Sequence, residues 1–120
     1  MFPSSLLAKL FVKGTLKNTE NGFEFKLKNI IDNGTLIGLG SLNVDAATYL
    51  PSAMIIKVGE KERRGDAISR TEPLPVRAFS EIHIRVEGAP LEAGTHKILV
   101  LIYTREVGRL QFTVDEPVNS

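Results

Sequence analysis

Residues 15–27 constrain the fold of this chain more than any other stretch. Leu16 ends a run with apolar residues at every second position, residues 17–22 are polar and turn-forming, and residues 23–27 read Phe-Glu-Phe-Lys-Leu. Alternation with a period of two is typical of a β-strand with one buried face, whereas a helix would scatter these apolar residues around its axis. The stretch therefore predicts a β-hairpin.

The same alternation recurs along the chain. It predicts further strands over residues 10–16, 35–44, 54–58, 81–87, 95–103 and 109–114, and a short edge strand at 67–70. Turn-forming residues separate them at 32–34, in the charged segment 59–65, and at 88–94;. Residues 45–50 are predicted to form a helical turn. Residues 71–75 must be a loop or a sheet edge, because Pro73 and Pro75 cannot donate hydrogen bonds to a neighbouring strand.

About eight short, evenly spaced strands without a helix of convincing length predict an all-β fold. The expected architecture is an antiparallel β-sandwich, immunoglobulin-like or jelly-roll-like. A chain of 120 residues with 42% hydrophobic residues can bury one core;. We therefore expect a single β-sandwich domain over residues 1–120, with frayed ends at 1–8 and 115–120.

The composition makes several function classes unfavourable. A net charge of +1, from 15 basic and 14 acidic side chains, provides no overall field for nucleic acid or an anionic membrane;. The chain has no cysteine, which excludes disulfides, thiolate catalysis and cysteine-ligated metals;. No apolar run approaches the ~20 residues of a membrane-spanning helix, and the apolar N-terminal residues have no preceding basic region. We expect a cytoplasmic protein with neither nucleic-acid nor membrane partners.

Catalytic motifs are missing from the sequence. The serines lack the surroundings of an activated nucleophile, and the pair Gly38 and Gly40 has neither the third glycine nor the following helix of a phosphate loop;. The basic residues between 57 and 70 alternate with acidic ones and lack stacking aromatics, which favours a solvated loop over a nucleic-acid surface. No catalytic residue is predicted.

A ligand site would have to use the two histidines and their neighbours. Glu81, His83 and Arg85 point outward from one predicted strand, and His96 opens another. If these four residues, all predicted to point outward, converge at the mouth of the sandwich, they would form the site of a small enzyme or a small-molecule binder. Zinc ligation by both histidines with a carboxylate lacks supporting spacing, so we predict no metal and no cofactor.

An interface is predicted from surplus apolar surface. Residues 95–103 carry apolar side chains on both faces of one strand, with Leu99, Leu101 and Tyr103 on the second face. A two-layer sandwich buries only one face of a strand, so the second face is available for another chain. Gly38 and Gly40 lie on one face of the strand predicted at residues 35–44 and form a flat stripe where another backbone or side chain can approach closely;.

Two segments resemble a known family. The end of the hairpin, Gly22-Phe23-Glu24-Phe25-Lys26-Leu27, and the later segment from Gly88 to Ile98 are similar to the β-subunit domain of bacterial C-glycoside deglycosidases. Members of that family are small β-sandwiches that accompany a larger barrel-type catalytic subunit. The resemblance implies a non-catalytic sandwich that acts through protein assembly, as an accessory subunit of a larger enzyme or as a homo-oligomer.

Overall fold

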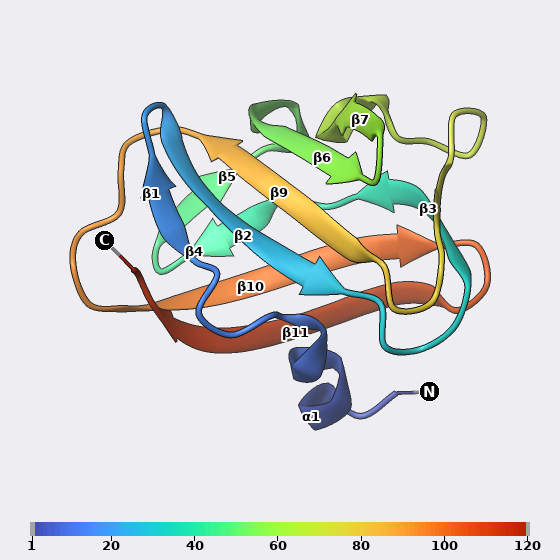
Figure 1. Cartoon of the computed structure of the whole chain (residues 1–120), viewed down its shortest axis with the longest axis horizontal. Helices are drawn as coiled ribbons and strands as arrows, with labels where there is room; N and C mark the ends of the chain where they lie inside the picture. Colours follow the sequence, from blue (N-terminus) through green and yellow to red (C-terminus); the bar gives the residue numbers. More distant parts are fainter. Residues whose placement is uncertain (1, 120) are drawn as a thin grey trace.

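The chain folds into two antiparallel β-sheets packed face to face, as the computed structural model shows for residues 2–119 (Figure 1). This arrangement confirms the antiparallel β-sandwich predicted from the sequence. The described residues form eleven strands rather than about eight;. The additional strands are three or four residues long, which is too short for a clear alternating pattern.

Sheet A contains five strands in the order β1-β2-β9-β6-β7. Their bounds are β1 (Lys17–Thr19), β2 (Gly22–Lys28), β9 (Glu81–Glu87), β6 (Met54–Val58) and β7 (Lys61–Arg64). The long strands β2 and β9 are paired along their full length, from Gly22 opposite Glu87 to Lys28 opposite Glu81. The alternation in both strands therefore places all their apolar side chains on the same inner face.

Sheet B is organised around its longest central strand. It contains β5 (Ala47–Tyr49), β4 (Leu42–Val44), β10 (Thr95–Thr104), β3 (Gly34–Leu39) and β8 (Leu74–Val76), with β11 (Gly108–Pro117) paired to β10. One edge of β10 pairs with β4 and β3 in succession, and the other edge pairs with β11. The edge strand β8 contains Pro75, in agreement with the predicted loop or edge.

Helical segments in the described residues are short. They are α1 (Ser4–Leu7) and three 3₁₀ turns: η1 (Ala8–Leu10), η2 (Pro51–Ala53) and η3 (Gly65–Ala67). Within residues 2–119, no helix has the length and apolar character that crossing a membrane requires.

The hairpin predicted at residues 15–27 is present, but its first strand is shorter than predicted. Thr19 lies opposite Gly22, so that the two residues between them form the turn. Residues 10–16 are not part of a sheet ladder beyond a single bridge between Phe11 and Leu27. The chain bulges out at Gly14, where φ is 82°, a conformation that glycine adopts readily;. Leu16 is nevertheless fully buried, which explains why the sequence alternates without forming a long strand.

Three other local predictions were wrong. Residues 45–50 form the β4–β5 hairpin and not a helical turn, with Asp45 at φ 55° in the turn itself. Most of the charged segment 59–65 is β7, which pairs with β6 as an edge strand. Residues 67–70, predicted as an edge strand, belong to η3 and the following loop. The first two segments are mostly exposed, so no buried face leaves its period in the sequence;. In the third, Ile68 is the one buried residue, and a single buried side chain sets no period.

The core lies between the two sheets and is apolar. Phe23, Phe25, Ile56, Leu74 and Ile98 are fully buried. The rings of Phe11 and Phe25 stack with centroids 5.1 Å apart, and Phe23 meets Tyr49 edge to face at 5.2 Å;. The segment before β1 thus seals one side of the core without contributing a strand.

The ends that the sequence predicts to fray hold regular structure where they are described. Leu7 of α1 is buried, and β11 continues to Pro117. Asn119 donates a backbone hydrogen bond of 2.8 Å to Leu16. Met1 and Ser120, which belong to the predicted frayed ends, lie outside the described residues. Fraying in solution and the division into domains stay predictions.

Candidate functional site

The outer face of sheet A carries charged residues that pair with one another across strands. His83 Nε2 lies 2.8 Å from Glu24 Oε2 and Arg85 Nη2 lies 3.2 Å from Glu62 Oε1. A third pair joins Lys26 to Glu81 at 3.8 Å. Three of the predicted ligand residues, Glu81, His83 and Arg85, therefore lie together on this face, and each already has a partner in the same sheet.

His96 lies apart from those three residues, because it belongs to sheet B. Its side chain is on the inner face of β10 and only 9% exposed. Asp45 Oδ2 lies 2.6 Å from Nδ1, and the backbone oxygen of Glu92 lies 2.7 Å from Nε2. Both partners accept hydrogen bonds, so both ring nitrogens must carry protons. The sequence prediction that His96 points outward is corrected by this geometry.

The surroundings of His96 favour its charged form. The hydrogen bond to the Glu92 carbonyl, followed by the one to Asp45, raises the pKa of His96 above its ordinary value of 6.5;. Hydrogen bonds from the Lys97 backbone and from His96 lower the pKa of Asp45 below 3.8. The pair connects the β4–β5 turn to the start of β10, which is a structural role.

The outer face of sheet B has an apolar centre, which we call the β10 face: Leu99, Leu101, Tyr103, Gly38 and Gly40. Leu99 and Leu101 are half-buried and Tyr103 is 38% exposed. The two glycines lie beside these side chains. A Cβ atom on Gly40 would come within 2.6 Å of the Leu101 side chain, and one on Gly38 within 3.4 Å of the Tyr103 ring. The glycines let both large side chains lie flat against the sheet.

Polar residues flank the β10 face, including the charged Arg109, which lies opposite Tyr103. Asn43 and Thr113 lie opposite Leu99 on the neighbouring strands, and Gln111 lies opposite Leu101. An apolar centre with a polar border is typical of a protein interface. The predicted interface residues are thus brought together on one surface.

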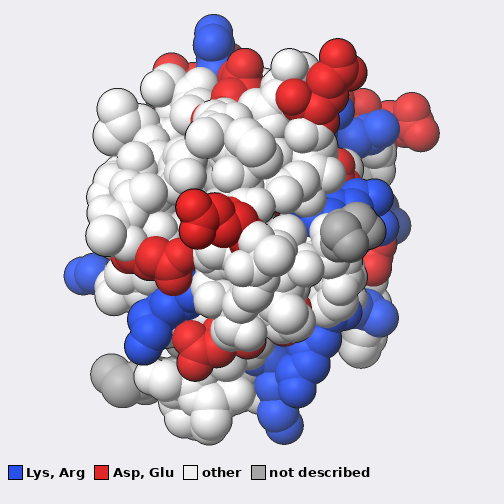
Figure 2. All heavy atoms as spheres, turned by 90° about the vertical axis from the view of Figure 1, so that its left-hand side faces the viewer, with Lys and Arg blue, Asp and Glu red and all other residues white. Residues whose placement is uncertain are grey.

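Charges are mixed at the end of the sandwich that Figure 2 shows, the left-hand end in Figure 1. Lys and Arg atoms and Asp and Glu atoms are interspersed there among neutral residues, without an extended region of one sign. The β9–β10 connection lies at this end (Figure 1).

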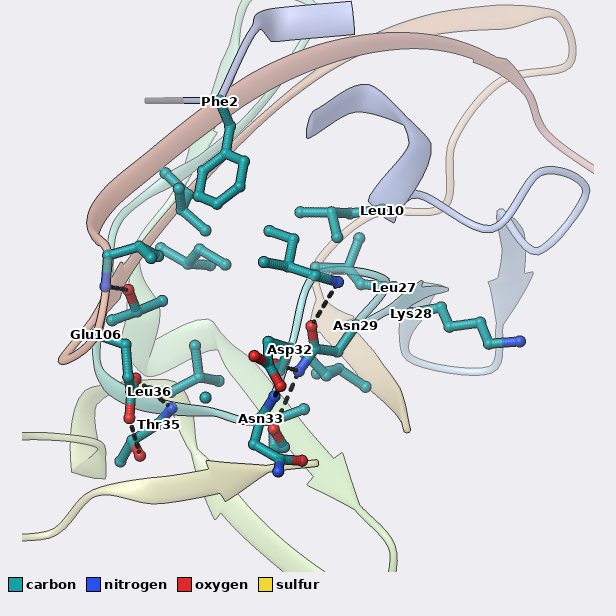
Figure 3. A pocket seen from close by; sticks show the side chains of 18 residues that line it. Phe2, Leu10, Leu27, Lys28, Asn29, Asp32, Asn33, Thr35, Leu36 and Glu106 are labelled. Carbon is teal, nitrogen blue, oxygen red and sulfur yellow. Dashed lines mark hydrogen bonds between the residues drawn. The ribbon is translucent and has the colours of Figure 1, made fainter. Parts of the chain in front are cut away.

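The opposite end of the sandwich contains a partly open cavity of about 400 Å³, which we call the mouth cavity. Its wall is formed by apolar residues of both sheets: Leu27 and Ile82 from sheet A, Leu36, Ile102 and Leu110 from sheet B. Phe2 and Leu10 of the N-terminal segment point into it from one side (Figure 3).

The rim of the mouth cavity is polar and acidic. Glu106 accepts hydrogen bonds of 2.8 Å at both carboxylate oxygens, from the backbone nitrogen and the hydroxyl of Thr35. The hydroxyl bond is the main reason that the pKa of Glu106 is lowered;. Asp32 accepts a bond of 2.7 Å from the Asn33 backbone at one oxygen. Both carboxylates are therefore held in place at the rim (Figure 3).

Asn29 holds this rim in shape. Its side-chain amide donates to the backbone oxygens of Asp32, at 2.7 Å, and of Val76, at 3.0 Å, while Ile31 donates to its Oδ1 at 3.1 Å. The cavity was not predicted from the sequence. The turn at residues 32–34 was its only visible signal, and the other lining residues come from segments far apart in the chain.

Among residues 2–119, no group of three or more His, Asp or Glu side chains is arranged to hold a metal ion.

A family model described as "Hydroxymethylglutaryl-CoA reductase, N-terminal domain" matches residues 6–119. No curated protein matches the chain significantly. The match corrects the resemblance to the β-subunit domain of C-glycoside deglycosidases, because it covers nearly the whole chain with a different family. The two segments that carried the resemblance are a hairpin and a connection between two strands, both of which recur in unrelated β-sandwiches.

Proposed function

Since the chain belongs to the hydroxymethylglutaryl-CoA reductase N-terminal domain family, we propose that it is a non-catalytic domain that assembles with the catalytic part of such a reductase. The family name places domains of this kind in a larger enzyme. The β10 face would be the docking surface, and the catalytic part would carry out the reduction.

The contrast between the outer faces of the two sheets carries this proposal. On sheet A, charged side chains pair across strands, and the Lys26–Glu81 and Arg85–Glu62 pairs are exposed, as expected of a surface that faces water;. On sheet B, the centre is formed by two leucines, a tyrosine and two glycines. Covering that apolar centre removes it from water, which favours association.

The histidines support a non-catalytic role. His83 pairs with Glu24 on an open sheet face, and both nitrogens of His96 are used in bonds to Asp45 and Glu92. Neither histidine lines the mouth cavity, where a general acid or base would need to reach a bound substrate;. Binding of a ligand by Glu81, His83, Arg85 and His96 stays a prediction, as does a cytoplasmic location.

Complex formation with the catalytic part of a hydroxymethylglutaryl-CoA reductase from the same organism tests the proposal. The two purified chains should elute together in size-exclusion chromatography, with a mass from light scattering that equals their sum. Leu101→Glu should abolish the complex, because it buries a charge in the interface. Tyr103→Glu, at a more exposed position, should weaken it without affecting folding.

Ile55→Glu is the matched control. Ile55 is a half-buried apolar residue on the outer face of sheet A, opposite Arg85, so this variant makes the same chemical change on the other sheet and should leave the complex intact. Separate elution of the two wild-type chains would overturn the proposal, as would a stable homodimer that uses the β10 face. Hydroxymethylglutaryl-CoA reduction by the chain alone would contradict the non-catalytic role.

A further inference from the structure

We propose that the mouth cavity binds a small amphiphile with an apolar body and a neutral or cationic head that donates hydrogen bonds. This site is independent of the β10 face, because it lies between the sheets at one end of the sandwich. Its binding test can therefore fail or succeed whatever the outcome for assembly.

The wall of the cavity determines the body of the ligand. Leu27, Leu36, Ile82 and Ile102 belong to both sheets and converge on one space of about 400 Å³. That volume lies in the range of small-molecule sites, which are mostly apolar with a few fixed polar groups. These four side chains are only 2–6% exposed. An apolar body that enters the cavity removes their remaining accessible surface from water, which favours binding.

The rim determines the head of the ligand. Glu106 is held by two bonds from Thr35, and Asp32 by one from Asn33, so both carboxylates keep their position without a ligand. Each oxygen of a carboxylate can accept more than one hydrogen bond, so both groups retain capacity for a donor. A hydroxyl or an ammonium group fits such a rim.

An anionic head does not fit the rim, because it would meet two carboxylates of the same sign. The basic residue of the lining, Lys28, extends away from the cavity in Figure 3. Coenzyme A thioesters carry several phosphate charges, so the substrate named in the family description is not the ligand of this site.

The rigidity of the site supports binding. Asn29 ties the rim to Val76, and Ala78 donates a backbone hydrogen bond of 2.9 Å to Asn33 Oδ1. The loop between β2 and β3 is therefore fixed to the loop after β8. Because the loops of a preformed pocket are already ordered, little conformational entropy is lost when a ligand enters.

Displacement of a neutral fluorescent probe, N-phenyl-1-naphthylamine, by three decyl compounds tests the proposal with the full chain. 1-Decanol and decylamine should displace the probe at concentrations at least about tenfold lower than decanoate does. Equal or better displacement by decanoate would overturn the assignment of the head. If the probe does not bind and none of the three decyl compounds displaces it, the proposal that the cavity binds a ligand is overturned.

Gly34→Phe is the blocking variant. Gly34 lines the cavity, and a Cβ atom there would make only ordinary contacts of 3.7 Å, with Asp32 and Glu106. The phenyl ring should fill the mouth of the cavity and weaken binding of the probe at least about tenfold. Thr48→Phe, which adds the same ring to an exposed position on β5, should bind as the wild type does. Unchanged binding by a folded Gly34→Phe variant would overturn the location.

Methyl chemical shifts of the wild type provide a measurement that does not depend on the folding of any variant. Addition of 1-decanol should shift the methyl signals of Ile82 and Ile102, which line the cavity, and leave those of Ile55 unchanged. The reverse pattern would place the ligand elsewhere.

Glu106→Gln should weaken the binding of decylamine more than the binding of 1-decanol, because only the ammonium group of decylamine loses an opposite charge at the rim.

Discussion

Two buried or half-buried polar residues show how single side chains hold this sandwich together. The Asn29 side chain forms hydrogen bonds with four backbone groups around the rim of the mouth cavity. His96 joins the β4–β5 turn to the β9–β10 connection through both ring nitrogens. Buried polar groups need such partners, because an unpaired one costs about 1–3 kcal/mol.

The His96–Asp45 pair predicts a pH dependence of stability. The raised pKa of His96 means that its stabilisation is fully present below pH 6.5 and is lost as the pH rises through the raised value;. The lowered pKa of Asp45 means that its contribution is present above pH 3.8 and is lost as the pH falls through the lowered value;. The pair is therefore most effective between those two pH values.

Urea denaturation of the wild type and of His96→Gln at about pH 5.5 and about pH 9 measures this effect. The difference in the free energy of unfolding between the two proteins should be larger at the lower pH. His83→Gln is the control, because it removes the other histidine. An equal difference at both pH values would show that His96 does not titrate in this range.

Substitution of Gly22 and of Gly34 by alanine should have effects of very different size on stability. A Cβ atom on Gly22 would lie 1.9 Å from the backbone oxygen of Val86, whereas one on Gly34 meets nothing closer than 3.7 Å. Gly22→Ala should lower the free energy of unfolding by roughly 3 kcal/mol or more, because a backbone atom of β9 would have to move. Gly34→Ala should change it by less than about 1 kcal/mol. Thermal denaturation of the two variants side by side checks the contrast.

At the scale of elements, connections are fixed as firmly as strands. Asn18 on β1 donates from its side-chain amide to the Leu91 oxygen at 2.9 Å, and the Leu91 nitrogen donates back to its Oδ1 at 2.8 Å. This reciprocal pair ties the first hairpin to the long connection between β9 and β10. The connection is thereby held at one point in its middle.

Asn18→Ala should lower the free energy of unfolding by about 1 kcal/mol, the net value of exposed hydrogen bonds of this kind. It should also increase amide hydrogen exchange around Leu91 in residues 88–94, which lose one of their anchors;. Asn21→Ala, in the turn of the same hairpin, is the comparison. Equal exchange in the two variants would show that the Asn18 pair does not order the connection.

Strands with one solvated face were predictable from the sequence, and fully exposed elements were not. The bounds of β9 agree with the predicted residues 81–87, because every second side chain is buried. Lys61–Arg64 of β7 carries only charged residues at the edge of sheet A, so nothing in its composition marks a strand. Ala47–Tyr49 is too short to separate a period of two from a helical turn;.

The β10 face was predictable from the sequence, and the mouth cavity was not. The apolar side chains on both faces of β10 predicted the location of a surface that the structure places on the outside of sheet B. The prediction that His96 points outward was wrong. His96 lies two residues before Ile98 and so on the same inner face of β10, although its side chain is polar. The mouth cavity is a space between separate segments, and empty space has no pattern in a sequence.

The whole molecule is asymmetric. Sheet A presents paired charges to solvent, while sheet B presents an apolar centre. Strand β3 contributes to both features of sheet B, because Gly38 belongs to the β10 face and Leu36 lines the mouth cavity on the inner side. The two proposed activities thus use opposite sides of the same sheet.

The position of β10 has a consequence for biosynthesis. Its residues from Ile98 to Thr104 pair with β4 and β3, which are made much earlier on the ribosome. Until residues 95–104 emerge, both of those strands keep an unpaired edge, and such edges recruit other chains. Nascent chains that stop before β10 should therefore be the species that aggregate and that chaperones retain, whereas chains that have completed β10 should be released.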